Sequence, residues 1–276
     1  MQRHLTLAVA NQKGGVAKTT TVISLGAAFV EQGLRVLVGD LDAQPSLTFS
    51  LGVDPNEVEC GVYDLLTGEA AAADVVVSAE DGLDLLPSSI DLSAAESLLL
   101  PRMDREFVLR RALAEFDTGY DVVLLDCSPS LGVLTLNALA ASDEVLVPLQ
   151  CEMLSHRGVG QLLDTVDDVR RLLNPRLSVR GLLPTMFDAR VVHARAVLAD
   201  VAERYGVPMI EPPIPRSVRF AEAPAAGRSV LRTARTSKGA AAYRAVAAGL
   251  LSAWGIRSRR RRVPVAAGAR TAGPPG

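Results

Sequence analysis

The sequence VANQKGGVAKTTT, from Val9 to Thr21, sets the architecture expected for the whole 276-residue chain. An apolar run, Leu5–Ala10, leads into it, and a helix-forming segment continues from Lys18 to about Glu31. This order predicts a buried strand, a glycine-containing loop and a helix N-terminus. Backbone N–H groups of such a loop turn inward and cradle phosphates, and the start of the helix adds positive partial charge. The stretch therefore predicts a binding site for the phosphates of a nucleotide.

The end of the loop carries the two side chains that phosphate binding uses. Lys18 can reach the β- and γ-phosphate oxygens, and the hydroxyl of Thr19 can bind Mg²⁺. The chain has only three lysines against twenty-six arginines, and two of the three are Lys13 and Lys18. An ammonium group is a compact point charge, so its use here favours a phosphate site over a glycine turn that begins an ordinary helix.

The loop departs from the common pattern G-x-x-x-x-G-K-[ST], because Gln12 and Ala17 stand at the glycine positions. With Lys13 and two glycines ahead of Lys18, it instead resembles the deviant phosphate loop, K-G-G-x-G-K-T, of the ParA/MinD family of dimeric ATPases. The resemblance implies ATP and Mg²⁺ as cofactors, with Lys13 reaching across a dimer to the partner's nucleotide. It implies nucleotide contacts from Lys13, Gly14, Gly15, Val16, Ala17, Lys18, Thr19 and Thr20.

Ala17 stands where the family has glycine. If the position needs a positive φ, alanine costs about 1–2 kcal/mol there. A cost of this size is compatible with ATP binding. It puts the usual loop geometry and the rate of ATP turnover in question.

Two acids follow the second predicted strand, 34–39, in the stretch Asp40–Pro45, DLDAQP. Carboxylates at i and i+2 on a strand end face the same way, and the carboxyl ends of parallel strands line the ligand crevice. We therefore expect both to look toward the phosphates; two solvated acids in a turn are the alternative. The stretch resembles the family's switch I, D-x-D-P-Q, with Ala43 in place of proline. The resemblance implies that Asp42 orients the attacking water and that Asp40 joins the Mg²⁺ shell through water.

The run Val122–Asp126, VVLLD, has the form of a buried parallel strand that delivers a carboxylate to a Mg²⁺ shell, as a Walker B Asp does. Such a run is common by chance. It supports a Mg²⁺ site here because it follows the phosphate loop in the sequence. The following Ser128 replaces a proline of the family's switch II, D-x-P-P-S. The metal ligands predicted in this way are Thr19 directly, with Asp40 and Asp126 acting through water.

Alternating strand and helix patterns predict one three-layer α/β domain with a mostly parallel central sheet, the P-loop NTPase fold, over residues 1–255. The expected strands are 5–10, 34–39, 83–87, 122–126, 144–148 and 179–183. The expected helices are 18–31, 62–66, 105–116, 134–141, 155–173 and 240–254.

Residues 212–224, PPIPRSVRFAEAP, closely resemble the I-P-R-N-V-R-L-x-E-A-P stretch of chromosomal ParA proteins. The resemblance implies nucleotide contacts from Met186, Pro215 and Arg216. It also implies that Arg190 and Arg219 bind non-specific DNA, because they match positions thought to do so in ParA relatives. Neutralisation of phosphates by arginine is independent of sequence. The alternative is that both arginines are solvated surface charges.

The net charge of −2 hides an uneven distribution. Residues 256–276 hold six arginines and no acid, which leaves the remainder at −8, so overall charge does not identify a DNA-binding protein. We expect this arginine-rich tail to be disordered.

The three cysteines are widely spaced without a C-x-x-C pair, which argues against a disulfide framework and against the metal-cluster ATPases of the superfamily. No membrane-spanning run or signal peptide is recognised, which predicts a cytoplasmic protein.

The resemblance implies a ParA-like ATPase of chromosome or plasmid partitioning, associated with the nucleoid. ATP would join two protomers into a homodimer that binds non-specific DNA, and a ParB-like protein would stimulate hydrolysis. One alternative is a MinD-like regulator that cycles on a membrane, disfavoured because the predicted helix 240–254 holds a single basic residue, Arg244. A second alternative is a nucleotide-gated binding protein with little hydrolysis. Lys13 disfavours a small-molecule ligase.

Overall fold

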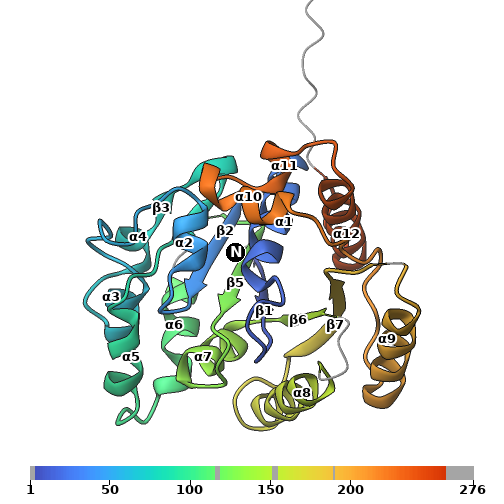
Figure 1. The fold of residues 1–276 in the computed structure, drawn as a ribbon. Helices are drawn as coiled ribbons and strands as arrows, with labels where there is room; N and C mark the ends of the chain where they lie inside the picture. The colour runs from blue at the N-terminus through green and yellow to red at the C-terminus, as the bar shows by residue number, and fades with distance from the viewer. Residues whose placement is uncertain (1–3, 116–118, 151–154, 189, 259–276) are drawn as a thin grey trace, which may run out of the picture.

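A seven-stranded sheet forms the centre of the computed structural model, which describes residues 4–115, 119–150, 155–188 and 190–258. The strand order is β3-β4-β2-β5-β1-β6-β7, and all neighbours are parallel except β3 and β4 (Figure 1). The strands are β1 (Leu5–Val9), β2 (Val36–Leu41), β3 (Val77–Ser78), β4 (Asp84–Leu86), β5 (Val122–Cys127), β6 (Glu144–Gln150) and β7 (Ser178–Thr185).

Helices connect the strands and cover both faces of the sheet. The α-helices are α1 (Lys18–Glu31), α2 (Ser46–Ser50), α3 (Val62–Thr67), α4 (Ala72–Val75), α5 (Leu92–Leu99), α6 (Val108–Glu115), α7 (Val133–Ala141), α8 (Ser155–Leu172), α9 (Val192–Tyr205), α10 (Arg219–Glu222), α11 (Val230–Thr233) and α12 (Lys238–Trp254). Three short 3₁₀ turns are η1 (Glu80–Gly82), η2 (Arg105–Phe107) and η3 (Pro224–Ala226).

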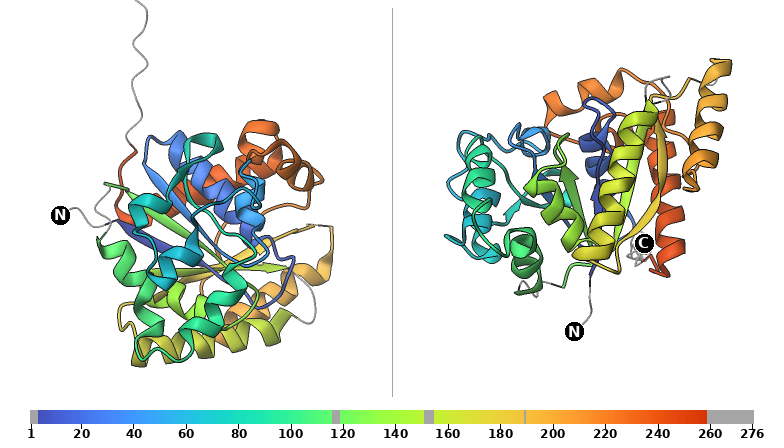
Figure 2. Two further views of the ribbon diagram at one scale, coloured as in Figure 1. Left: turned by 90° about the vertical axis from the view of Figure 1, so that its left-hand side faces the viewer. Right: turned by 90° about the horizontal axis from the view of Figure 1, so that it is seen from below.

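The alternation of side chains along β1 divides the core into two layers. Leu7 and Val9 pack with α1, α11 and α12, whereas Ala8 and Ala10 pack with the helices of the other face, among them α3, α6 and α7. The left view of Figure 2 shows these two sets of helices on opposite sides of the sheet. A strand covered on both faces must be apolar throughout, which explains the unbroken apolar runs of β1 and β5. The predicted fold class is confirmed.

Several boundaries differ from the sequence prediction. β2 continues to Leu41, so Asp40 lies inside the strand and pairs in register with Asp126 of β5. The predicted helix 105–116 is the turn η2 followed by α6, and the short antiparallel β3 was not predicted. The tail from residue 259 lies outside the described residues. Just before it, Ser258 donates a hydrogen bond to the carbonyl of Gln32 at 3.1 Å.

The strand order places a ligand crevice at the carboxyl end of β1. The chain moves from β1 to one side of the sheet through β2 to β4, returns as β5, and continues on the other side through β6 and β7. In open α/β sheets, ligands bind outside the carboxyl ends of the strands where the order reverses in this way. Among the described residues, no helix is both long enough and apolar enough to cross a membrane.

Candidate nucleotide site

The loop between β1 and α1 is held in place from below by two buried polar side chains. Asn11 accepts a hydrogen bond from the backbone N–H of Lys13 at 2.9 Å and donates to the carbonyl of Pro148 at 2.7 Å. The hydroxyl of Thr185, at the end of β7, donates to the carbonyl of Val16 at 3.0 Å. The loop is therefore fixed between β1, β6 and β7 before any ligand binds.

The backbone of the loop turns into the left-handed region twice. Gly15 has φ 72°, and Ala17, the residue before the first turn of α1, has φ 67° and ψ 34°. Ala17 therefore has the positive φ for which the sequence predicts a cost, because this backbone conformation favours glycine. A Cβ atom built on Gly14 or Gly15 would meet no atom within 4 Å, so both glycines leave open space beside the loop.

Around this loop lies a cavity of about 610 Å³. Lys18 lines it and is only 8% exposed, and its ammonium group donates to the carbonyl of Lys13 at 3.3 Å. Burial lowers the pKa of Lys18, while the negative charge of Asp126 acts in the opposite direction. The predicted residues Gly14, Gly15, Ala17, Thr19 and Thr20 also line the cavity; Val16 is buried beneath it.

The two acids at the end of β2, Asp40 and Asp42, have different surroundings. Asp40 is fully buried and accepts three hydrogen bonds, from the backbone N–H and hydroxyl of Thr48 and from the backbone N–H of Asp42. Burial raises the pKa of Asp40 to about 6, although the bonds from Thr48 act to lower it. Asp40 thus lies deeper than predicted, and it is Asp42 that lines the cavity.

The residues at the end of β5 fit a Mg²⁺ ion. The hydroxyl of Thr19 donates to Oδ2 of Asp126 at 2.6 Å, which leaves the lone pairs of the hydroxyl oxygen available for a metal. Among the described residues, Oδ1 of Asp126 has no hydrogen-bond partner although it is buried. Burial, reinforced by the charge of Asp40, raises the pKa of Asp126. A buried acid with one unpaired oxygen can accept a hydrogen bond from metal-bound water, and a nearby cation would stabilise its ionised form.

The opposite wall of the cavity contains the residues predicted to contact the rest of the nucleotide. Met186, Pro215 and Arg216 all line it. They are brought together by backbone hydrogen bonds from Phe187 to Ile214 at 2.9 Å and from Arg216 to Phe187 at 3.2 Å. Met186 has φ 50°, which is uncommon for a residue other than glycine.

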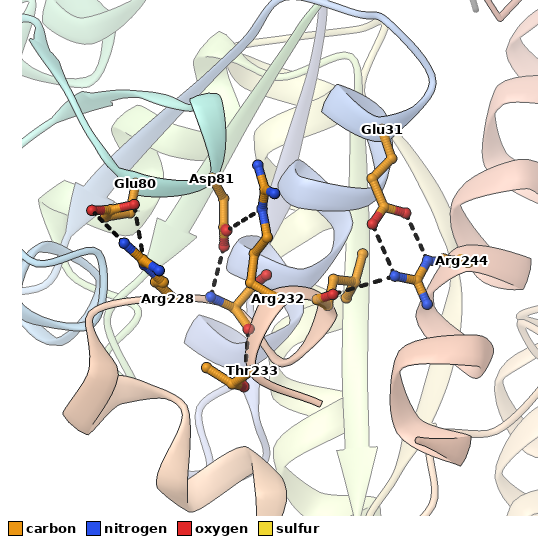
Figure 3. A network of polar contacts seen from close by, with 9 residues as sticks. Glu31, Glu80, Asp81, Arg228, Arg232, Thr233 and Arg244 are labelled. Carbon is orange, nitrogen blue, oxygen red and sulfur yellow. Dashed lines mark hydrogen bonds and ion pairs between the residues drawn. The ribbon is translucent and has the colours of Figure 1, made fainter. Parts of the chain in front are cut away.

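The same wall continues into α10, and charged groups fasten the segment that follows, from Arg228 through α11, to the body of the domain (Figure 3). Asp81, in the turn η1, accepts a hydrogen bond from the backbone N–H of Ser229 at 2.7 Å and from Nε of Arg232 at 3.2 Å. The Asp81 side chain is 1% exposed, so this contact is the buried part of the network. Further ion pairs join Arg228 to Glu80 and Arg244 to Glu31.

The two arginines predicted to bind DNA both lie at the surface, and each is paired with a nearby acid. Arg190 makes a two-pronged contact with Asp188, at 2.9 and 2.8 Å, which lowers the pKa of Asp188 to about 2. Arg219, the first residue of α10, pairs with Glu222 at 2.8 Å. Their exposure leaves room for DNA phosphates, which would have to compete with these acids.

Sequence reasoning missed several residues that shape the cavity. Thr48 and Ser88 support Asp40 and Asp42, and Thr185 supports the loop. Tyr243 of α12 lines the cavity and shares a 3.0 Å hydrogen bond with Thr21 of α1. Apart from the contact of Thr48 with Asp40, 8 positions away, the hydrogen bonds named here join residues at least 40 positions apart, and no local motif marks these residues in the sequence.

Comparisons with known proteins place this geometry in a family. The family described as an AAA domain matches residues 4–179. The chromosome-partitioning ATPase Soj of Thermus thermophilus is 47% identical over 241 residues, which are 87% of this chain and 93% of that protein. The chromosome partitioning protein ParA of Caulobacter vibrioides is 43% identical over 249 residues, 89% of this chain and 93% of that protein.

A solved structure of a Mycobacterium smegmatis protein is 52% identical, with a TM-score of 0.83, and covers 92% of this chain and 96% of its own. That protein is named cobyrinic acid a,c-diamide synthase, and it was solved with ADP and magnesium and with an ATP analogue and magnesium. The predicted cofactors, ATP and Mg²⁺, are thus the ones found with a structural neighbour. The chain belongs to the ParA/Soj family of P-loop ATPases.

Proposed function

We propose that the chain is a partitioning ATPase that dimerises with ATP, binds DNA non-specifically and is stimulated by a ParB-like partner. The observation that carries the proposal is that Lys18, Thr19 and Asp42 line one cavity at the carboxyl ends of the central strands, with Asp126 bonded to Thr19. The proposed location is the cytoplasm, on the nucleoid.

The proposed roles are those that the family resemblance implies, and the positions of the residues support them. Lys18 and the N–H groups of the loop would bind the phosphates, Thr19 and Asp126 would hold Mg²⁺ directly and through water, and Asp42 would orient the attacking water. When bound, Mg²⁺ neutralises charge on the phosphates. Catalysis at such a site is mainly positioning and charge stabilisation, so slow basal turnover is expected until a partner completes the geometry.

The position of Lys13 supports the dimer. Its backbone is held by Asn11 and its carbonyl faces Lys18, yet Lys13 is not among the residues that line the cavity of its own protomer. We propose that Lys13 serves the nucleotide of a second protomer. This role of Lys13 rests on the family resemblance together with that placement.

Two alternatives lead to different measurements. The buried face of α12, which includes Tyr243, Val246 and Leu250, packs on α1, and Arg244 is paired with Glu31. The apolar side of this helix is thus occupied by the core, which disfavours membrane cycling.

The name of the M. smegmatis protein suggests an amide ligase, for which a carboxylic acid and ammonia, rather than DNA and a partner, would stimulate phosphate release.

The deciding experiment is phosphate release from ATP by the whole chain, alone, with DNA, with a purified ParB-like protein, and with both. Stimulation that needs both DNA and partner supports partitioning. Binding of ATP without release under any of these conditions supports a nucleotide-gated binding protein. Stimulation by a corrinoid carboxylic acid with ammonia would refute the partitioning function.

A further inference from the structure

Two fully buried hydroxyl residues, Thr48 of α2 and Ser88 after β4, connect Asp40 of β2 with Asp42, which follows the strand. The backbone N–H of Ser88 donates to the hydroxyl oxygen of Thr48 at 2.9 Å, and that hydroxyl lies 2.8 Å from Oδ2 of Asp40. The hydroxyl of Ser88 donates to the carbonyl of Asp42 at 2.8 Å. The four residues form one hydrogen-bonded group beneath the cavity.

The direction of each bond is fixed by chemistry. A hydroxyl has one proton, and because the Thr48 oxygen accepts from Ser88, its own proton points to the carboxylate of Asp40. Asp40 in turn accepts from the backbone N–H of Asp42 at 3.2 Å. Both backbone polar groups of Asp42, its N–H and its carbonyl, are thus bound to this group. The peptide units on both sides of the residue that faces the cavity are held by buried partners.

We infer that Thr48 and Ser88 are positioning residues, which hold Asp42 in the orientation that water attack on the nucleotide needs. The inference rests on the proposed ATPase role of Asp42. A displacement of about 1 Å in a catalytic group can cost roughly 100-fold in rate, so small losses of support should be visible.

Two variants each remove a part of the support, and a third restores one part. Thr48→Val removes the hydroxyl but keeps the backbone N–H that donates to Asp40, and Thr48→Ser restores the hydroxyl on a smaller side chain. Ser88→Ala removes the bond to the carbonyl of Asp42. The matched control is Ser142→Ala, a buried hydroxyl that donates to the carbonyl of Ala138 at 2.7 Å, at the end of α7.

The first readout is steady-state ATP hydrolysis. Thr48→Val and Ser88→Ala should each lower kcat about tenfold to 100-fold while KM stays within about threefold, because the cavity lining is unchanged. Thr48→Ser should recover most of kcat, and Ser142→Ala should match the unaltered protein in kcat. The double variant should cost little more than the larger single change, since both residues act on one group.

The second readout needs no catalysis. In the nucleotide-free protein, hydrogen exchange at the amides of Asp42 and Gln44 should become about tenfold faster in Thr48→Val and Ser88→Ala, and not in Ser142→Ala. Failure of the unaltered protein to hydrolyse ATP would refute the proposed function and leave this measurement valid. Unchanged exchange at both amides, or an unchanged kcat in an active enzyme, would overturn the inference. A uniform rise in exchange over the whole chain would also overturn it, since it would show a general loss of stability.

Discussion

The hydroxyl oxygen of Thr19 lies 2.6 Å from Oδ2 of Asp126, which ties the first turn of α1 to the end of β5. The two residues are 107 positions apart in the sequence, and only the parallel register of β1 with β5 brings them together. The hydrogen bond fixes the orientation of both side chains. The site is therefore supported by contacts within the chain, and substitutions in it should act on binding and on catalysis separately.

Lys18→Ala should lower ATP affinity by roughly 100-fold, since a charge-assisted contact with phosphate contributes up to about 3 kcal/mol. The control is Lys238→Ala, which removes the exposed lysine at the start of α12. Nucleotide affinity can be measured by isothermal titration calorimetry with ATP and Mg²⁺. An unchanged dissociation constant in Lys18→Ala would show that the loop does not bind phosphates as proposed.

Asp42→Ala should bind ATP with an affinity within about threefold of the unaltered protein and hydrolyse it roughly 100-fold more slowly. The carboxylate is proposed to position water and not to hold the nucleotide, so the ATP-bound dimer should accumulate. Size-exclusion chromatography with ATP tests the dimer, and Asp167→Ala on the exposed face of α8 is the control. Undiminished hydrolysis, or a species that remains monomeric with ATP, would mean that Asp42 has a different role.

Ala17→Gly should stabilise the loop by about 1 kcal/mol and tighten ATP binding by roughly fivefold, because it relieves the left-handed strain at φ 67°. Ala245→Gly, at an exposed position inside α12, should have the opposite effect and lower the free energy of unfolding by about 0.5–1 kcal/mol. Urea unfolding and ATP titration of both variants provide the comparison. Weaker ATP binding by Ala17→Gly would show that the loop depends on the methyl group.

The loop and the central strands could be predicted because their signals are local. The Lys13–Lys18 spacing and the apolar runs of β1 and β5 are readable within a few residues. For Ala17 the sequence predicted a cost only if its φ is positive. It could not predict the sign of φ, because the left-handed backbone depends on the anchors at Asn11 and Thr185. The predicted end of β2 was also too early, because no residue near Asp40 indicates that Asp40 pairs in register with Asp126 of β5.

The support of the acids could not be predicted for a similar reason. Thr48 and Ser88 are ordinary hydroxyl residues whose partners are set by how α2 and the end of β4 pack against β2. Tyr243 reaches Thr21 across 222 positions, through the packing of α12 on α1. Periodicity predicts that α12 packs on the core, but it does not predict which residue of α1 its tyrosine will meet.

The raised pKa of Asp40 predicts a dependence of stability on pH. In the folded protein this pKa is about 6, above the usual value of 3.8. Protonated Asp40 therefore stabilises the fold below about pH 4, and this contribution, on the order of 3 kcal/mol, is lost as pH rises through 6. Asp40→Asn removes the titration. The difference in unfolding free energy between the two proteins should move in favour of the variant between pH 4 and 6.5, and a difference that is constant over this range would contradict the assignment.

The last prediction separates two sources of DNA affinity, the folded surface with Arg219 and the arginines after Ser258. A dimer presents the surface twice on one face, so binding through it should require ATP and fall steeply with salt. Arg219→Glu should remove this ATP-dependent binding, whereas Arg170→Glu on α8, the same charge reversal in an arginine that also pairs with an acid three positions away, should not. Truncation after Ser258 keeps the contact of Ser258 with Gln32 and removes five arginines, so it should weaken binding equally with and without ATP. Polarisation titrations of labelled duplex across a salt series measure both effects. Full ATP-dependent binding by Arg219→Glu would refute the surface, and loss of all binding on truncation would transfer the role to the tail.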